Sequence, residues 1–224
     1  MEWPRPGHDP YAAARAAMVE SLRPHVRDER VLDAFGRVPR ERFVAPELRH
    51  RAYDDTPLPI GHGQTISQPL VVAIMLDLLR LQPEDRALDI GTGSGYQAAL
   101  MSLLVREVVT VERIPELAES AAAVLEELGY ANVVVHVAGE QLGWPEGAPY
   151  NAIACAAAAP RVPEALVEQL TPDGRLVLPV GPLGDQELVL VERTPQGTRE
   201  TRKGGCRFVP LIGEGAYRMP ERRS

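Results

Sequence analysis

Apolar and polar positions change rhythm along the chain, and the change predicts its elements. From residue 67 onward, short apolar runs alternate with stretches of helical periodicity. The runs predict strands at 86–90, 108–111, 133–137, 152–155 and 175–179, and the periodic stretches predict helices at 69–81, 96–105, 115–129 and 163–170. Such alternation is typical of an α/β fold with a doubly wound, mostly parallel sheet and right-handed crossovers.

The N-terminal part follows a different pattern. Residues 9–35 are expected to be mostly helical with a break near Pro24, and a second helical piece covers 30–35. Asp9 is the expected N-cap, with Pro10 at the first helical position. The segment 37–66, rich in proline and glycine, predicts an irregular loop of the kind that usually has a function.

The C-terminal part reads as an antiparallel hairpin. After Gly181, strands are predicted at 187–193 and 198–202, joined by a turn at 195–197. These changes of pattern divide the chain into a helical and loop extension, 1–66, a sheet domain, 67–217, and a tail, 218–224. We expect the three parts to form one compact unit.

Composition excludes several classes of protein. The chain has 224 residues and a net charge of −7, which argues against a partner with a phosphate backbone such as nucleic acid. Its two cysteines and five histidines show no metal-ligand spacing and no disulfide framework. We expect no metal, no membrane span or signal core, and a monomer in a reducing, cytoplasmic setting.

One glycine-rich string carries most of the chemical information. Asp89 precedes Gly91, Gly93 and Gly95, and the string follows a predicted strand and opens a helix. A dinucleotide fingerprint would need glycine at position 96, where the chain has Tyr96, and a P-loop would need a Gly-Lys-Ser/Thr ending. A carboxylate at Asp89 would repel a pyrophosphate but suits the ammonium group of S-adenosylmethionine.

A second acidic residue lies in register with that loop. Glu112 ends the next predicted strand, 17 residues after Gly95. In dinucleotide-binding folds, an acidic side chain at this place accepts hydrogen bonds from the ribose hydroxyls. The loop and the two carboxylates together predict a site for S-adenosylmethionine and its product, S-adenosylhomocysteine.

Four further segments resemble the protein-L-isoaspartate(D-aspartate) O-methyltransferase family. They are Val38-Pro39-Arg40-Glu41-Arg42-Phe43-Val44, the string from Leu58 to Pro69 that contains Gln-Thr-Ile-Ser-Gln-Pro, Gly143 to Tyr150 with 157–160, and Arg207 to Gly213. The resemblance covers about residues 25–217. It implies a Rossmann-like methyltransferase fold and transfer of the donor's methyl group to the free carboxylate of L-isoaspartyl residues in damaged proteins or peptides. Repair would then proceed through a succinimide.

The resemblance also implies roles for particular residues. Ser67 is the catalytic residue, although a serine before a predicted helix is also a plain N-cap. The strip between donor and acceptor is Gln64, Thr65 and Ile66. The acceptor chain would be held by the remaining set, which is Ile60, His62, Val209, Pro210 and Leu211.

The chain departs from the family pattern in a few places. Gly139 stands where the family's aspartate lies near the adenine, and Glu140, one position on, is a candidate substitute. Asn151 and Ala156 replace the usual aspartate and threonine. These differences leave two alternatives: a relative that methylates one aspartate of a dedicated peptide during its maturation, and a non-catalytic module that binds the cofactor. The intact Ser67 string argues against the module.

Overall fold

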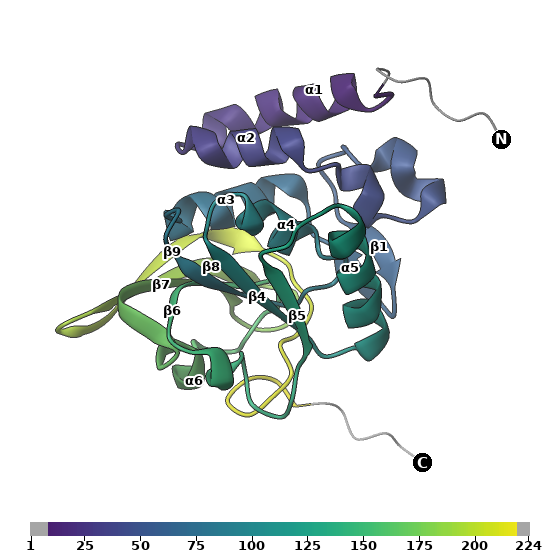
Figure 1. Cartoon of the computed structure of the whole chain (residues 1–224). Helices are drawn as coiled ribbons and strands as arrows, with labels where there is room; N and C mark the ends of the chain where they lie inside the picture. The colour runs from purple at the N-terminus through teal and green to yellow at the C-terminus, as the bar shows by residue number, and fades with distance from the viewer. Residues whose placement is uncertain (1–8, 219–224) are drawn as a thin grey trace, which may run out of the picture.

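The centre of the molecule is a seven-stranded sheet (Figure 1). The computed structural model describes residues 9–218, and the strand order is β5-β4-β3-β6-β7-β8-β9. The strands are β3 Arg86–Ile90, β4 Glu107–Glu112, β5 Val133–Val137, β6 Tyr150–Cys155, β7 Leu170–Val180, β8 Gln186–Thr194 and β9 Gly197–Cys206. The first five run parallel, and β8 and β9 add an antiparallel hairpin. The predicted doubly wound α/β fold with a C-terminal hairpin is therefore confirmed.

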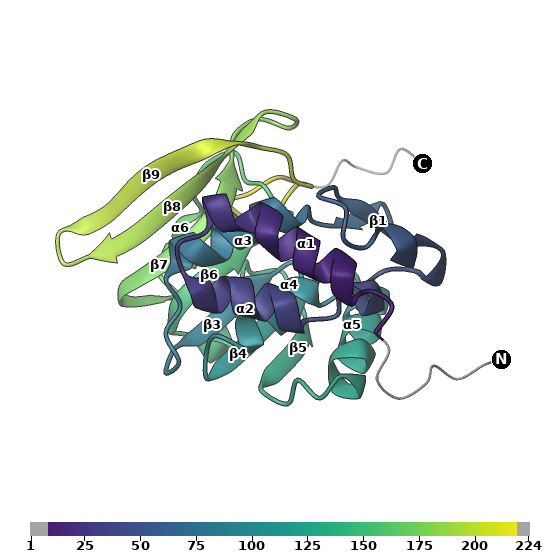
Figure 2. The ribbon, with the colours of Figure 1, turned by 90° about the horizontal axis from the view of Figure 1, so that it is seen from above.

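Helices cover the sheet in unequal layers. They are α1 Ala12–Leu22, α2 Glu29–Arg37, α3 Pro69–Leu79, α4 Tyr96–Ser102, α5 Pro115–Glu127 and α6 Glu164–Val167. Seen from above, α1 and α2 lie over α3 and α4 (Figure 2), so the N-terminal extension adds an outer layer to one face. None of the helices in residues 9–218 has the length and apolar character needed to cross a bilayer.

The outer layer shares its core with the sheet domain. Phe35 of α2 and Phe43 both meet the ring of Tyr96 edge-on, with centroids 6.1 Å and 5.5 Å away. Such tilted aromatic contacts stabilise a core beyond the burial of their area. Phe35 and Tyr96 are almost completely buried. The N-terminal extension is thus packed against α4 at the point where the glycine loop ends.

Two predictions about the N-terminal part are wrong. Helix α1 has Tyr11 as its N-cap, because the Asp9 carboxylate accepts a hydrogen bond from the Tyr11 backbone N–H at 2.9 Å and forms a turn before the helix. The segment 37–66 is not irregular throughout. It contains the 3₁₀ helices Arg40–Phe43 and Pro46–Arg51, and the hairpin of β1 Leu58–Gly61 and β2 Gln64–Ile66.

Elsewhere the expected elements are present with shifted ends. Strands β3 and β5 have the predicted bounds. Helix α6 is only four residues long, where 163–170 was expected to be helical, because Leu170 already begins β7 and pairs with Tyr150. The side chain of Gln169, just before β7, donates hydrogen bonds to Leu142 O and Ala165 O and accepts one from Trp144 N.

Candidate active site

Two adjacent cavities open at the carboxyl ends of the parallel strands. The first, about 260 Å³, is lined by residues 64–67, the loop after β3, the end of β4, residues 138, 139 and 141–143, and the C-terminal segment. The second, about 640 Å³, lies between β2, the start of α3 and residues 184–186 and 205–209. Four residues belong to both walls: Thr65, Ser67, Ala156 and Val209. A molecule in one cavity is therefore separated from a molecule in the other by a single layer of side chains.

The glycine loop requires backbone conformations that other residues rarely adopt. Gly93 and Gly95 have φ values of 53° and 89°. A Cβ atom on Gly93 would lie 3.2 Å from Ile60 Cδ1, and one on Gly95 would lie 3.3 Å from the side chain of Leu125. The hairpin that carries Ile60 therefore packs directly on the loop, which explains why glycine is needed there.

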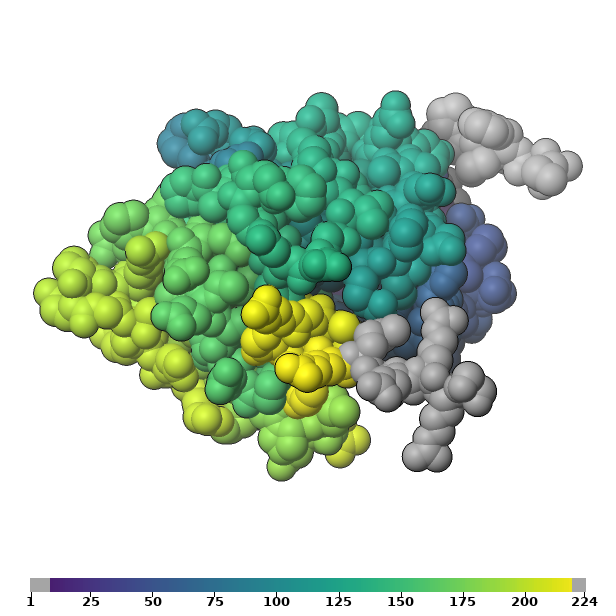
Figure 3. All heavy atoms as spheres, turned by 90° about the horizontal axis from the view of Figure 1, so that it is seen from below, coloured from purple at the N-terminus to yellow at the C-terminus, as the bar shows by residue number. Residues whose placement is uncertain are grey.

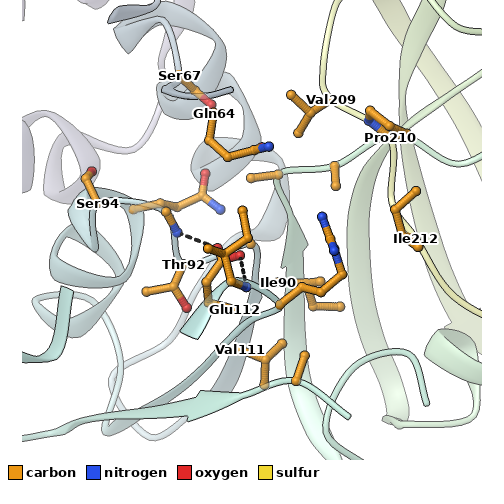
Figure 4. Close-up of a pocket in the computed structure, with 18 of the residues that line it drawn as sticks. Gln64, Ser67, Ile90, Thr92, Ser94, Val111, Glu112, Val209, Pro210 and Ile212 are labelled. Atoms are coloured by element: carbon orange, nitrogen blue, oxygen red, sulfur yellow. Dashed lines mark hydrogen bonds between the residues drawn. The ribbon is translucent and has the colours of Figure 1, made fainter. Parts of the chain in front are cut away.

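Glu112 organises the loop as well as lining the first cavity (Figure 4). Its Oε2 accepts from Gly93 N and its Oε1 accepts from Ile114 N, both at 2.9 Å. The side chain is 7% exposed, so the carboxylate lies in the cavity wall with each oxygen held by one backbone amide. Each oxygen keeps a second acceptor site for a ligand hydroxyl.

Asp89 does not lie where the sequence suggested. Its carboxylate is completely buried beneath the loop, accepting from Gln97 Nε2 at 2.7 Å and from Thr110 Oγ1 at 2.8 Å. It is absent from the wall of the first cavity, so the expected direct contact with a ligand ammonium group is wrong for this geometry. The side chain of Asp89 instead points to neighbouring elements, β4 and α4, that only the fold brings together.

The sequence did not indicate Gln97, which the structure places in the wall of the first cavity. Its Nε2 is committed to Asp89, and its Oε1 is buried with no hydrogen-bond partner among residues 9–218. Buried acceptors are usually satisfied, so this oxygen is an exception in the wall of the first cavity. The sequence feature that could have indicated Gln97 is its position as the second residue of the helix after the glycine loop.

Burial changes the acidity of Asp89. Loss of solvent raises the pKa of this carboxyl to about 7, the hydrogen bonds from Thr110 and Gln97 oppose the rise, and the nearby charge of Glu112 adds to it. The effect of burial therefore outweighs that of the two hydrogen bonds at this carboxyl.

Ser67 is not a helix cap. The N-cap of α3 is Gln68, and Asp55, fifteen residues before Leu70, supplies the capping carboxylate by accepting from Leu70 N at 2.9 Å. The interpretation of Ser67 as a plain N-cap is therefore wrong, and its half-buried side chain lies in the wall between the two cavities. Because Asp55 occupies the Leu70 amide, that amide is not free to face an acceptor anion.

Gln64, Thr65 and Ile66 all line the first cavity, as expected of the strip between donor and acceptor, and Val209 and Pro210 line it too (Figure 4). Of these two residues, which were expected to hold the acceptor, Val209 also lines the second cavity, whereas Pro210 lines the first alone. The C-terminal segment, brightest yellow in Figure 3, lies on the surface between the green and teal parts of the chain. It is held there by backbone hydrogen bonds of 2.7 Å from Ala158 N to Val209 O and from Leu211 N to Ala158 O.

Several other expected contacts are missing. Leu211 is buried behind the wall and Ile212 lines the cavity in its place. His62 is exposed at the tip of the β1–β2 hairpin and lines neither cavity. Gly139 does line the first cavity, but Glu140 does not, and Gln141 is its polar neighbour there. Within the described residues there is no cluster of three or more potential metal ligands.

The buried Asp89 makes a pH prediction. Its folded-state pKa of about 7 lies above the ordinary value of 3.8, so the folded protein binds this proton more tightly than the unfolded chain. The contribution of Asp89 to stability therefore falls as the pH rises from about 4 to about 7. We expect urea unfolding to show wild type losing stability relative to Asp89→Asn over that interval. A difference that stays constant with pH would contradict the assignment.

Comparisons with known proteins agree with this arrangement. A family model described as protein-L-isoaspartate(D-aspartate) O-methyltransferase (PCMT) matches residues 13–216. Protein-L-isoaspartate O-methyltransferases from Aeropyrum pernix and Methanopyrus kandleri are 53% and 50% identical, covering 99% and 94% of this chain and 89% and 96% of those proteins.

Solved structures give the same result. One protein-L-isoaspartate O-methyltransferase has a TM-score of 0.80 at 28% identity, covering 90% of this chain and 67% of that one. A putative enzyme of this kind from Plasmodium falciparum, in complex with S-adenosyl-L-homocysteine, has a TM-score of 0.75 at 25% identity and covers 87% of this chain and 96% of its own. Since the family model spans both cavities, the chain belongs to the protein-L-isoaspartate(D-aspartate) O-methyltransferase family.

Proposed function

We propose that this chain transfers the methyl group of S-adenosylmethionine to the free carboxylate of L-isoaspartyl residues in damaged proteins or peptides. The observation that supports this most directly is the wall shared by the two cavities, with Ser67 in it. The first cavity takes the methyl donor and the second takes the acceptor chain. The net charge of −7 favours a protein acceptor over nucleic acid. As expected from the sequence, we take the enzyme to act as a monomer in the cytoplasm.

The residues of the first cavity fit the donor. Glu112 presents both carboxylate oxygens to the ribose hydroxyls, and the unpartnered Gln97 Oε1 suits an ammonium group. The bound donor supplies an electrophilic methyl on a sulfonium. Asp89 acts from behind: by accepting from Gln97 Nε2, it keeps the amide oxygen of Gln97 as the group available to the ligand.

The acceptor needs positioning more than activation. A carboxylate is already ionised at pH 7, so no general base is required. The Ser67 hydroxyl, which lies in both walls, donates to one carboxylate oxygen and directs the other toward the methyl group. The ester that forms then loses methanol when the following main-chain amide nitrogen attacks it, which closes the succinimide without further help from the protein.

The first test concerns the acceptor. The extra backbone methylene of an isoaspartyl residue moves its carboxylate relative to a normal aspartate. We expect methylation of an isoaspartyl peptide to exceed that of the aspartyl isomer by about a hundredfold, the usual effect of misplacing reacting groups by an ångström. Methyl incorporation from labelled donor measures this. Equal rates on the two isomers would favour an enzyme that modifies aspartate in a dedicated peptide.

The second test concerns Ser67. Losing a hydrogen bond to a charged group is worth about 1.5–3 kcal/mol, so Ser67→Ala should lower kcat/KM by about ten- to a hundredfold. Ser67→Asp should be slower still, because its charge repels the acceptor carboxylate. Turnover is measured where thermal unfolding shows each variant to be folded. Ser21→Ala, in α1 and outside both cavities, is the control. Normal activity in Ser67→Asp would remove Ser67 from the mechanism.

The third test separates the two ends of the donor. S-Adenosylhomocysteine and 5′-methylthioadenosine share the nucleoside, but only the former has the ammonium group. Glu112→Ala should weaken calorimetric binding of both by about 1.5–3 kcal/mol, whereas Gln97→Leu should weaken only the former to a similar extent. If Gln97→Leu weakens both ligands equally, its role is structural rather than contact with the ammonium group.

A further inference from the structure

Arg40 is the largest fully buried side chain of the described chain. It comes from the 3₁₀ helix Arg40–Phe43 of the N-terminal extension, and its side chain reaches the residues just before α3. Its Nε donates to Ala52 O at 2.7 Å and its Nη2 donates to Ser67 O at 2.8 Å. The guanidinium carbon lies 4.6 Å from the centre of the Tyr96 ring, which is a cation–π distance.

The charge of Arg40 is compensated without a direct ion pair: Tyr96, Tyr53 and the exposed Asp55 favour its charged form and oppose the effect of burial on its pKa. None of the ion pairs formed by residues 9–218 includes it, and its Nη1 is buried without a hydrogen-bond partner. Burial lowers its pKa, but a guanidinium stays protonated inside proteins. A buried charge without an ion-pair partner is destabilising, so its presence calls for a compensating role. Arg40 belongs to the 38–44 segment that resembles the family, but the sequence assigned it no role.

The charge lies directly behind the residue that joins the two cavities. A single peptide carbonyl, that of Ser67, separates the guanidinium from the serine in the shared wall. The other charged groups around the second cavity are exposed: Asp185 and Arg207 at its wall, and Asp55, which accepts from Gln68 Nε2 at 2.8 Å. Exposed charges are screened by water and salt, whereas a buried charge acts at low dielectric.

We propose that Arg40 is a positioning residue of the acceptor site. Its buried positive charge holds the acceptor carboxylate beside Ser67, and its hydrogen bond fixes the backbone from which Ser67 points. This inference rests on the proposed function, because it takes the group in the second cavity to be a carboxylate. It explains how a chain with a net charge of −7 retains an anion at its reaction centre. The contrasting possibility is that Arg40 only ties the N-terminal extension to the segment before α3.

The test compares a charged and a neutral acceptor. An isoaspartyl peptide and the same peptide with isoasparagine differ by one charge at nearly constant shape. Both are titrated into the protein saturated with S-adenosylhomocysteine, where no reaction occurs. We expect wild type to prefer the isoaspartyl peptide by about tenfold, the order that a nearby unit charge produces at intermediate dielectric. Arg40→Met should reduce this preference to below about twofold, and Arg40→Lys, which keeps the charge, should retain most of it.

A matched control is available on the same helix. Arg42 pairs with Glu127 at 2.7 Å, and Arg42→Met should leave the peptide preference unchanged. S-Adenosylhomocysteine affinity, measured for every variant, reports whether the fold and the first cavity are intact. Kinetically, the KM for the isoaspartyl peptide should rise in Arg40→Met more than in Arg40→Lys.

Each outcome bears on one hypothesis. An Arg40→Met variant that binds both peptides more weakly but keeps the preference would make Arg40 a structural tie and overturn the inference. If Arg40→Met does not fold, two other results overturn the inference. One is loss of the peptide preference in folded Arg40→Lys, and the other is the lack of any preference in wild type. Failure of wild type to bind either peptide would instead count against the proposed function.

Discussion

Parallel pairing of β3 with both β4 and β6 is the constraint on which the site depends. Ile90, the last residue of β3, is in register with Val111 on one side and Cys155 on the other. The chain leaves these three strands at their carboxyl ends, on the same side of the sheet. There the backbone of the glycine loop is held by a 2.9 Å hydrogen bond from Gly91 N to Val111 O. A ligand crevice at such a point, where the strand order reverses, is a general property of open α/β sheets.

The second cavity is assembled from segments that are far apart in the chain. The β1–β2 hairpin, the start of α3 and the end of β9 all contribute to its wall. Aromatic packing of Phe35 and Phe43 on Tyr96, which lines the first cavity, anchors the N-terminal extension to the sheet domain. The extension is therefore part of the active-site framework, because its removal would take away Arg40 and leave Tyr96 and the backbone of Ser67 without support.

One buried ionisable residue lies behind each cavity, Asp89 behind the first and Arg40 behind the second. Asp89 has hydrogen-bond donors on both oxygens, yet burial brings its pKa to about 7. Arg40 stays protonated and is stabilised by two carbonyl oxygens and by the ring of Tyr96. Asp89, a carboxyl with a raised pKa, thus lies behind the cavity proposed for the cationic donor. Arg40, which keeps its positive charge, lies behind the cavity proposed for the anionic acceptor.

The amino-acid sequence by itself determined the sheet, the glycine loop and the acidic residue at the end of β4, since these follow from local periodicity and from spacing along one stretch of chain. Strands β3 and β5 were predicted with their observed bounds, and Glu112 lies in the cavity wall. Tertiary structure alone decided which way side chains point and what they meet. It turned Asp89 toward Thr110 and Gln97, and it let Asp55 cap α3 so that Ser67 lies in the shared wall. These outcomes depend on partners eight or more residues away that belong to other elements, and a pattern read along the chain contains no information about such contacts until the backbone has folded.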